Sequence, residues 1–193
     1  MAKSRERILT AAKSCFTQHG YQATNVSLVS RYADISRVTI HKQFGSKQDL
    51  LRAVINEHFD QENALSEVLV ERDIDCWSKI HCLLQTWATP LFTDIEQDLI
   101  RNELLFAANK YCDDLLFEHR QKNTRYIATV LERALAANHI QLEAVDLSTV
   151  QFAELIELNF KGLLRAQNTG AIDTLIERNI GVYRQATLVT NCN

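Results

Sequence analysis

Residues that break helices are scarce in this sequence. Its 193 residues include one proline and five glycines, and the glycines lie mostly where the apolar pattern is interrupted. Proline removes a backbone donor, and glycine in a helix interior costs roughly 1 kcal/mol relative to alanine. A chain with so few of both is not rich in turns, so the sequence predicts a protein that is almost entirely helical.

Long apolar runs and paired cysteines are also missing. No uninterrupted apolar run approaches the roughly 20 residues of a membrane-spanning helix, and the charged N-terminus is unlike a signal peptide. The five cysteines, an odd number without a CxxC pair, argue against a disulfide framework. We therefore expect a cytoplasmic protein with free thiols. Redox sensing by Cys82 or Cys112 stays open as an alternative to a purely structural role.

No motif typical of an enzyme is present. The sequence has no Gly-rich phosphate loop, no HExxH, no GxSxG and no Cys–His pair in a recognisable context. Two acidic groups, at residues 57–62 and 94–98, are interpreted as solvated charge on helix surfaces. We expect no catalytic residue, no metal site and no cofactor.

Residues 24–47 predict two short helices joined by a tight turn. Asn25 can cap a helix over residues 26–33, and Ser36 can cap another over 37–44, with only two residues between them. This spacing is typical of a helix-turn-helix, whose second helix lies in the major groove of DNA. The side chains expected to point outward from the second helix are Arg37, Thr39, Lys42 and Gln43. Those expected to pack inward are Ile35, Ile40 and Phe44.

The first 55 residues resemble the DNA-binding domain of the tetracycline-repressor-like (TetR) family of bacterial regulators. The resemblance covers about a quarter of the chain and lies in several segments, in order and at the family's spacing. These segments are Arg7-Ile8-Leu9 with Ala11-Ala12 and Phe16, Gly20-Tyr21 with Thr24, the turn Ala33–Ser36, the recognition helix Thr39–Phe44, and Ser46–Leu51.

Three residues depart from the family pattern. Asp34 replaces a glycine in the turn, where aspartate tolerates left-handed backbone better than most residues. Val38 replaces a glycine early in the recognition helix and adds apolar contact surface. His41 replaces a tyrosine that touches a phosphate in the family, so a donor is kept but its reach is shorter.

The resemblance implies an all-α protein with a three-helix helix-turn-helix head and a helical bundle body that dimerises. We expect residues 1–46 to form the DNA-binding domain and 47–193 the ligand-binding and dimerisation domain. Arg37 and Lys42 are expected to read bases, and Thr24, His41 and Lys47 to touch phosphates. The full set of expected DNA-binding residues is Thr24, Arg37, Val38, Thr39, His41, Lys42, Gln43 and Lys47.

Charge divides the chain in the same way. Residues 1–55 hold nine basic and three acidic side chains, for a net +6, whereas the remainder holds 12 basic and 21 acidic ones, for a net −9. A basic head neutralises phosphates while an acidic body is repelled by them, which orients the molecule on DNA.

Beyond the motif, the apolar pattern predicts a long helix from residue 46 and five more helices. These cover about 75–89, 94–109, 112–138, 148–167 and 171–189. The helix over 148–167 is apolar nearly all round, which requires burial on two sides. We read the last two helices as a dimerisation hairpin, with packing inside one chain as the alternative. The expected interface residues are Phe160, Gly162, Leu163, Ala166, Ile176, Ile180, Gly181 and Tyr183.

The middle helices interleave aromatic and polar residues, as a small-molecule pocket requires. For any single aromatic residue, ordinary core packing is the competing interpretation. We expect an apolar or aromatic effector and not a sugar phosphate. The residues expected to bind it are Trp77, His81, Trp87, Phe106, Phe117, His119, Phe152 and Asn159.

Together these patterns predict a homodimeric DNA-binding regulator, a repressor released from a pseudo-palindromic operator by a small molecule. Two alternatives remain. One is a helical ligand-binding or protein-interaction module that has lost DNA binding. The other is an uncharacterised helical enzyme that uses His81 or His119.

Overall fold

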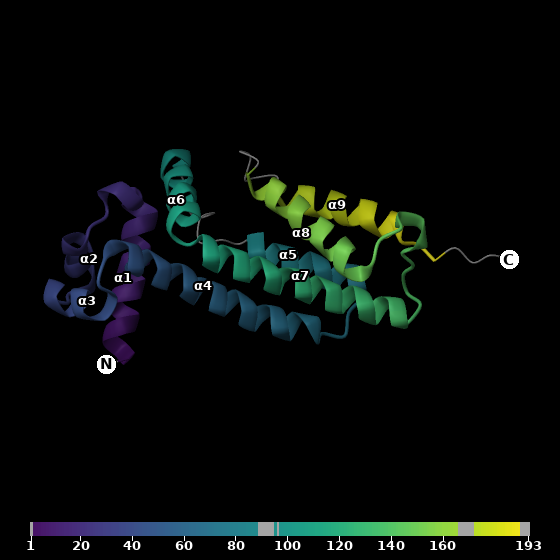
Figure 1. Ribbon diagram of the computed structural model, residues 1–193, viewed down its shortest axis with the longest axis horizontal. Helices are drawn as coiled ribbons and strands as arrows, with labels where there is room; N and C mark the ends of the chain where they lie inside the picture. Colours follow the sequence, from purple (N-terminus) through teal and green to yellow (C-terminus); the bar gives the residue numbers. More distant parts are fainter. Residues whose placement is uncertain (1, 89–94, 96, 166–171, 190–193) are drawn as a thin grey trace. The chain divides into compact units, whose positions relative to one another are not determined.

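The computed structural model describes residues 2–88, 95, 97–165 and 172–189, and every regular element in those ranges is helical (Figure 1). The all-α prediction is therefore confirmed for the described part of the chain. In chain order the elements are α1 (Ala2–Ala23), α2 (Val26–Ala33), α3 (Arg37–Phe44), α4 (Lys47–Val70), α5 (Cys76–Ala88), α6 (Asp98–Tyr111), α7 (Asp113–Ala136), a 3-10 turn η1 (Glu143–Val145), α8 (Thr149–Arg165) and α9 (Ile172–Ala186).

The chain divides into two compact units. The first comprises residues 1–61 and 90–118, and the second comprises 62–89 and 119–193. Each has its own hydrophobic core. α6 therefore belongs to the same unit as the helix-turn-helix, although α3 ends at Phe44 and α6 begins only at Asp98. This division differs from the predicted domain boundary at residue 46.

In the first unit, the two predicted caps form and fix the helix-turn-helix. Asn25 Oδ1 accepts from the backbone N–H of Leu28 at 2.9 Å, and Ser36 Oγ accepts from that of Thr39 at 3.2 Å. Asp34 adopts the left-handed conformation (φ 50°, ψ 49°) that the turn needs. The predicted bounds of α2 and α3 match the structure because these signals are local.

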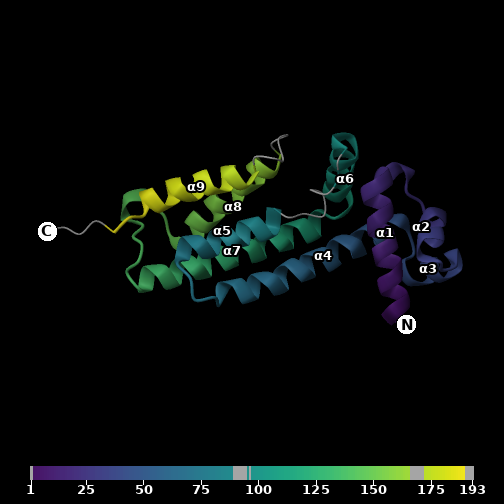
Figure 2. The same ribbon diagram turned by 180° about the vertical axis from the view of Figure 1, so that it is seen from behind.

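The second unit is a bundle in which α9 packs on α5 and α8. Figures 1 and 2, which view it from opposite sides, both show α8 and α9 side by side. Its core includes Trp77, Ile80, Leu131, Phe152 and Ile176, each no more than 5% exposed. The short 3-10 turn was not predicted, since three residues carry too little periodicity to be recognised.

Glu157 on α8 is an acidic side chain inside this bundle. The residue is 5% exposed, and Lys161 Nζ lies 3.2 Å from Glu157 Oε1. Burial raises the pKa of Glu157 from its ordinary 4.5 to about 7, with the positive charge of Arg120 acting in the opposite direction. The cost of desolvation thus outweighs the attraction of the nearby cations.

We predict that Glu157 makes the protein less stable as pH rises from about 4.5 to 7. In that window the folded protein keeps a proton that the unfolded chain releases, so the free energy of unfolding falls with pH. Each pKa unit corresponds to about 1.4 kcal/mol, so Glu157→Gln should gain roughly 1–3 kcal/mol at pH 8 relative to pH 4.5. Urea unfolding of both proteins across this range measures it, with exposed Glu154→Gln as the control. Parallel pH profiles for wild type and Glu157→Gln would contradict it.

Candidate functional site

Polar side chains cover the outer face of α3. Ile40 and Phe44 are buried on its inner face, at 1% and 8% exposure, whereas Val38 is 77% exposed. The other exposed side chains of α3 are Arg37, His41, Lys42 and Gln43. This helix therefore offers several hydrogen-bond donors beside one apolar contact, as a helix that reads base edges requires.

The first turn of α3 is tied to its cap and to α2. Thr39 is half-buried, and its hydroxyl lies 2.9 Å from Ser36 Oγ. Arg37 Nη1 donates to Ser27 Oγ at 3.3 Å, across the first turns of the two helices. A guanidinium has five N–H donors, so this one hydrogen bond orients Arg37 and leaves further donors for a bidentate contact to a base.

The start of α1 lies beside the far end of α3. Gln43 Nε2 donates to Ser4 Oγ at 3.3 Å, and the guanidinium of Arg5 lies 5.3 Å from the centre of the Phe44 ring. Exposed Lys3 and Arg5 thus add positive charge next to the recognition helix. Sequence reasoning did not include these residues among the DNA-binding set, although the basic excess of the first 55 residues contains them.

His41 is exposed and already uses one ring nitrogen. Its Nδ1 lies 2.8 Å from the carbonyl oxygen of Gly45. A carbonyl only accepts, so Nδ1 carries the proton, and the neutral ring presents an acceptor at Nε2. Only the imidazolium form can donate from Nε2 to a phosphate. The expected phosphate contact at His41 therefore requires a second proton on the ring.

Lys47 is held by the corner between α1 and α2. Its Nζ donates to the backbone carbonyl of Tyr21 at 2.9 Å and lies 4.2 Å from the centre of the Tyr21 ring. An ammonium has three donors, so one engaged donor is compatible with a phosphate contact. Lys47 at the start of α4 remains an expected phosphate ligand, now with a defined position.

The prediction that Thr24 touches a phosphate is wrong. The residue is 0% exposed, and its hydroxyl is within hydrogen-bond distance of the carbonyl oxygens of Gly20 (2.7 Å) and Cys15 (3.0 Å). A hydroxyl buried in this way closes the end of α1 and does not face a phosphate. The family resemblance suggested a phosphate contact at Thr24, but its hydroxyl is engaged by backbone carbonyls inside the first unit.

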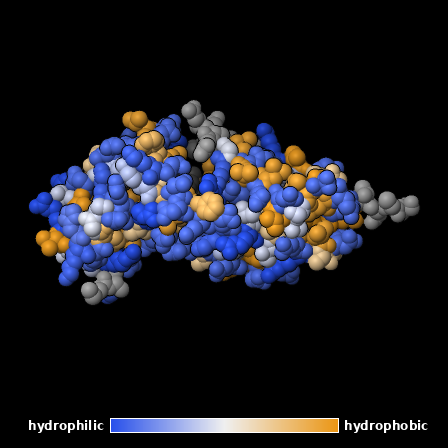
Figure 3. Space-filling view, viewed as in Figure 1, coloured by the Kyte–Doolittle hydropathy of each residue, from blue (hydrophilic) through white to orange (hydrophobic). Residues whose placement is uncertain are grey.

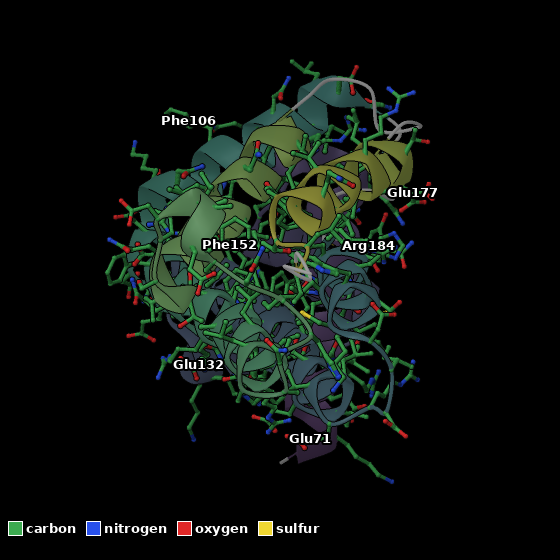
Figure 4. All side chains as sticks on the ribbon, turned by 90° about the vertical axis from the view of Figure 1, so that its right-hand side faces the viewer. Glu71, Phe106, Glu132, Phe152, Glu177 and Arg184 are labelled. Atoms are coloured by element: carbon green, nitrogen blue, oxygen red, sulfur yellow. The ribbon has the colours of Figure 1, made fainter. Side chains whose placement is uncertain are left out.

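Several predicted ligand-binding residues meet in the second unit. Trp77 and Phe152 both pack on Tyr183, with ring centres 6.4 and 5.7 Å away, and Asn159 Nδ2 donates to the Tyr183 hydroxyl at 2.8 Å. Figure 4 shows Phe152 pointing into the bundle. His81 is half-buried on α5. Trp77 and Phe152 are thus packed core around Tyr183, whereas Asn159 is exposed and contacts the hydroxyl of this tyrosine.

A second group joins α4, α5 and α7 in the same unit. Trp87 Nε1 donates to Ser66 Oγ at 2.9 Å, and His119 Nε2 lies 3.2 Å from Glu62 Oε2. Asn123 is one turn beyond His119, and its amide nitrogen lies 3.2 Å from the same ring nitrogen. These side chains form a polar cluster inside the bundle.

Two buried amides border this cluster. Asn63 and Asn123 are 8% and 4% exposed, and the Oδ1 atom of each finds no hydrogen-bond donor among the described residues. Buried polar atoms are nearly always paired, so such atoms need a partner of another kind. We call Glu62, Asn63, His119 and Asn123 the buried polar cluster.

Phe106 and Phe117, which were expected to bind the effector, do not lie with the other predicted ligand-binding residues. Both belong to the first compact unit, and they are 68% and 54% exposed. In Figure 4 the Phe106 side chain points away from the helices. Their aromatic character suggested a pocket, but helical periodicity does not tell which compact unit a helix joins.

Four residues that were expected at the dimer interface are instead buried within the single chain. Phe160, Ile176, Ile180 and Tyr183 are at most 7% exposed, and they belong to the core of their own chain. The sequence pattern identified them as apolar but not which surface they pack against. Leu163 is half-buried, and Ala166 lies outside the described residues.

The two glycines of the expected hairpin face open space. A Cβ atom added at Gly162 or Gly181 would meet nothing within 4 Å. The large apolar side chains exposed on α8 and α9 are Val150, Leu155, Leu158, Leu164 and Val182, from 38% to 66% exposed. Figure 3 shows hydrophobic residues gathered over this part of the molecule.

Burial argues against reactive thiols. It raises the pKa of Cys15, Cys76 and Cys112 to about 11, 12 and 11, respectively, so these groups stay protonated near neutral pH. Cys82 is half-buried, and Cys192 lies outside the described residues. Cys112 is therefore a poor redox sensor.

The described residues offer neither a metal-binding cluster nor a membrane-spanning helix. These residues include no group of three or more His, Cys, Asp or Glu side chains placed to hold a metal ion. None of the helices in the described ranges combines the length and hydropathy that a bilayer crossing requires.

Comparisons with known proteins agree with the geometry of the first unit. A model of the family described as bacterial regulatory proteins, tetR family, matches residues 8–54. Over 67 residues the chain is 31% identical to the uncharacterised HTH-type transcriptional regulator YvkB of Bacillus subtilis, covering 35% of each chain. Over 72 residues it is 35% identical to the HTH-type transcriptional repressor AcnR of Corynebacterium glutamicum, covering 34% of this chain and 38% of that one. The match thus spans about a third of the length of these relatives.

Solved structures resemble the whole chain in fold. A TetR transcription regulator from Haloarcula marismortui has a TM-score of 0.78 at 14% identity, covering 98% of this chain and 100% of that one. A transcriptional regulator from Cytophaga hutchinsonii has a TM-score of 0.75 at 12% identity, covering 95% and 98%. Identities this low show the fold alone.

The fold and the first unit define a helical regulator with an N-terminal helix-turn-helix. Residues 8–54 match the helix-turn-helix segment of the tetR family of bacterial regulatory proteins, and the chain shares the fold of a solved TetR regulator. Proteins of this family regulate transcription and are not enzymes, so the alternative of a helical enzyme using His81 or His119 is set aside.

We predict that Arg37 and Lys47 affect DNA binding in different ways. Arg37→Ala should relax base preference, because a bidentate arginine contact to guanine is worth about 1–3 kcal/mol of discrimination. Lys47→Ala should weaken binding to all sequences alike and lower the slope of log K against log salt by about one unit. Fluorescence anisotropy with a duplex selected from a random library, at several salt concentrations, measures both. Equal salt slopes and equal base preferences for the two variants would defeat the assignment.

Proposed function

We propose that this protein is a homodimeric repressor that binds a pseudo-palindromic DNA operator and is released by a small molecule. The main support for DNA binding is the exposed face of α3. This helix buries Ile40 and Phe44. It exposes Arg37, Lys42 and Gln43 beside the basic start of α1. The match of residues 8–54 to the tetR family model also supports DNA binding, and AcnR, a relative matched over 72 residues, is a repressor. A module without DNA binding remains the alternative, and a wild-type protein that binds no duplex at low salt would favour it.

The exposed surface of α8 and α9 supports the dimer. Leu155, Leu158 and Gly162 follow the spacing i, i+3, i+7 and so share one face of α8, and Val182 lies exposed on α9 beside Gly181. Exposed apolar side chains gathered on one helix face are typical of an interaction site. A second copy of the same hairpin supplies an equally apolar, self-complementary partner, which a two-fold interface requires.

We predict that Leu158→Glu produces monomers. The side chain is 64% exposed in a single chain, so a charge there leaves the fold intact and opposes its two-fold copy. Val68→Glu on α4, at a matching 63% exposure, is the control and should stay dimeric. Analytical ultracentrifugation measures the mass of both. Dimers of Leu158→Glu at micromolar concentration would place the interface elsewhere.

Gly162→Leu tests the same surface by adding volume. Because a Cβ at this position meets nothing within 4 Å in the single chain, any loss of association must come from contact with a partner. Overpacking typically costs about 1–3 kcal/mol per site, and a two-fold interface contains the site twice. A Gly162→Leu protein that stays dimeric at nanomolar concentration would remove Gly162 from the interface.

For the effector, we propose binding at the buried polar cluster. The unmatched oxygens of Asn63 and Asn123 support this, together with the aromatic surface of Trp87 nearby on α5. An apolar or aromatic body with one polar group fits such surroundings better than a sugar phosphate, because the Glu62 carboxylate repels an anion. Release of DNA requires that the effector binds more tightly to the form of the dimer that does not match the operator.

We predict that Asn123→Leu separates effector binding from folding. The change removes an unmatched buried oxygen together with the contact between Asn123 Nδ2 and His119 Nε2, so the melting temperature without ligand should stay close to that of the wild type. Thermal-shift screening of the wild type against aromatic compounds and phosphorylated sugars should yield stabilising aromatic compounds, and Asn123→Leu should lose most of their effect. Stabilisation by phosphorylated sugars alone, or shifts that survive in Asn123→Leu, would overturn this site.

A further inference from the structure

The corner between α1 and α2 begins at a break inside α1. Gly20 has φ 77° and ψ 173°, a conformation that side-chain-bearing residues rarely adopt. The chain then passes through Tyr21 and Gln22 to the cap of α2 at Asn25. The path of this corner therefore determines how α1 leads into the helix-turn-helix.

α6, which lies about 80 residues further along the chain, holds this corner in place. The Glu103 carboxylate accepts a hydrogen bond from the backbone N–H of Gln22. It also occupies the space beside Gly20, where an added Cβ would lie 2.8 Å from Glu103 Oε2. At the end of the same helix, the Tyr111 ring lies 5.3 Å from that of Tyr21. One helix thus fixes both the backbone and the side chain of the corner.

The α6–α7 junction is itself anchored to α4. Arg52 donates to both carboxylate oxygens of Asp114, at 2.7 and 2.6 Å, and to the Tyr111 carbonyl at 2.7 Å. The bidentate pair holds the pKa of Asp114 at about 2, so it persists throughout the neutral range. Tyr111 is therefore placed from outside α6 as well as from within it.

The corner in turn holds Lys47. Its ammonium donates to the Tyr21 carbonyl and lies over the Tyr21 ring, at the distances given above. A flexible lysine loses side-chain freedom when it makes a phosphate contact, and a prior anchor reduces that cost. What fixes Tyr21 consequently fixes the cation.

We infer that Glu103 is a positioning residue for DNA binding, acting through the Gly20–Gln22 corner to place Lys47 against a phosphate. The inference rests on the proposed operator binding. It assigns to α6 a part in the affinity for DNA, although none of its residues belongs to the recognition helix. Glu103→Gln keeps an acceptor for the Gln22 N–H, whereas Glu103→Ala removes it.

The test uses the full-length protein and a fluorescein-labelled duplex selected from a random library on the wild type. Glu103→Ala should bind this duplex about tenfold more weakly and with a salt slope lower by about one unit, as expected when one phosphate contact is lost. Glu103→Gln should restore most of the slope. Exposed Asn102→Ala, on the same helix, is the control and should match the wild type. Circular dichroism melts of all variants verify folding.

A double substitution gives the sharpest result. If Glu103 acts through Lys47, adding Glu103→Ala to the Lys47→Ala protein should weaken DNA binding no further, because the effects of coupled residues are not additive. Additive losses, or a wild-type slope for Glu103→Ala, would overturn the inference while leaving operator binding intact. Should Glu103→Ala unfold, the double variant Glu103→Gln/Tyr111→Leu replaces it. Its salt slope of DNA binding is then compared with that of the wild type in the same way. Absence of DNA binding by the wild type would overturn both the inference and the proposed function.

Discussion

The burial of Ile40 and Phe44 is the constraint on which the proposed DNA interface depends. These two side chains lock one face of α3 into the core of the first unit, so the opposite face is presented to solvent as a consequence. The serine cap at Ser36 and the left-handed Asp34 then fix where the helix starts and how it leaves α2. With both ends and the inner face fixed, the donors of α3 need no rearrangement to meet a groove, which lowers the cost of binding.

The first unit also contains α6, so the boundary between the two units does not fall directly after the helix-turn-helix. A boundary at residue 46 separates the helix-turn-helix from everything that follows, yet α6 supplies a carboxylate and an aromatic ring to the corner that precedes α2. The second unit has a separate core and contains both the buried polar cluster and the exposed hairpin surface. DNA contact and the two proposed control functions are thus supported by different hydrophobic cores.

Sequence reasoning succeeded where the signals are local. The bounds of α2 and α3 followed from Asn25 and Ser36, because a cap acts on the three residues after it. It was wrong where the answer depends on packing between distant segments. Phe160 and Ile176 were assigned to a partner but pack in their own chain, and Thr24 was assigned to a phosphate but is buried. Periodicity reveals that a helix face is apolar, and only the fold reveals what covers it.

Hydroxyl-radical footprinting of the selected duplex tests the central claim most directly, since it reports both the groove contact and the spacing of the two heads. A homodimer that inserts one α3 per half-site should protect two patches whose centres lie about one helical turn apart, roughly 34–36 Å or a multiple of it. The patches should be related by a two-fold axis and should disappear together as salt is raised. A single protected patch, or no protection at low salt, would contradict the account.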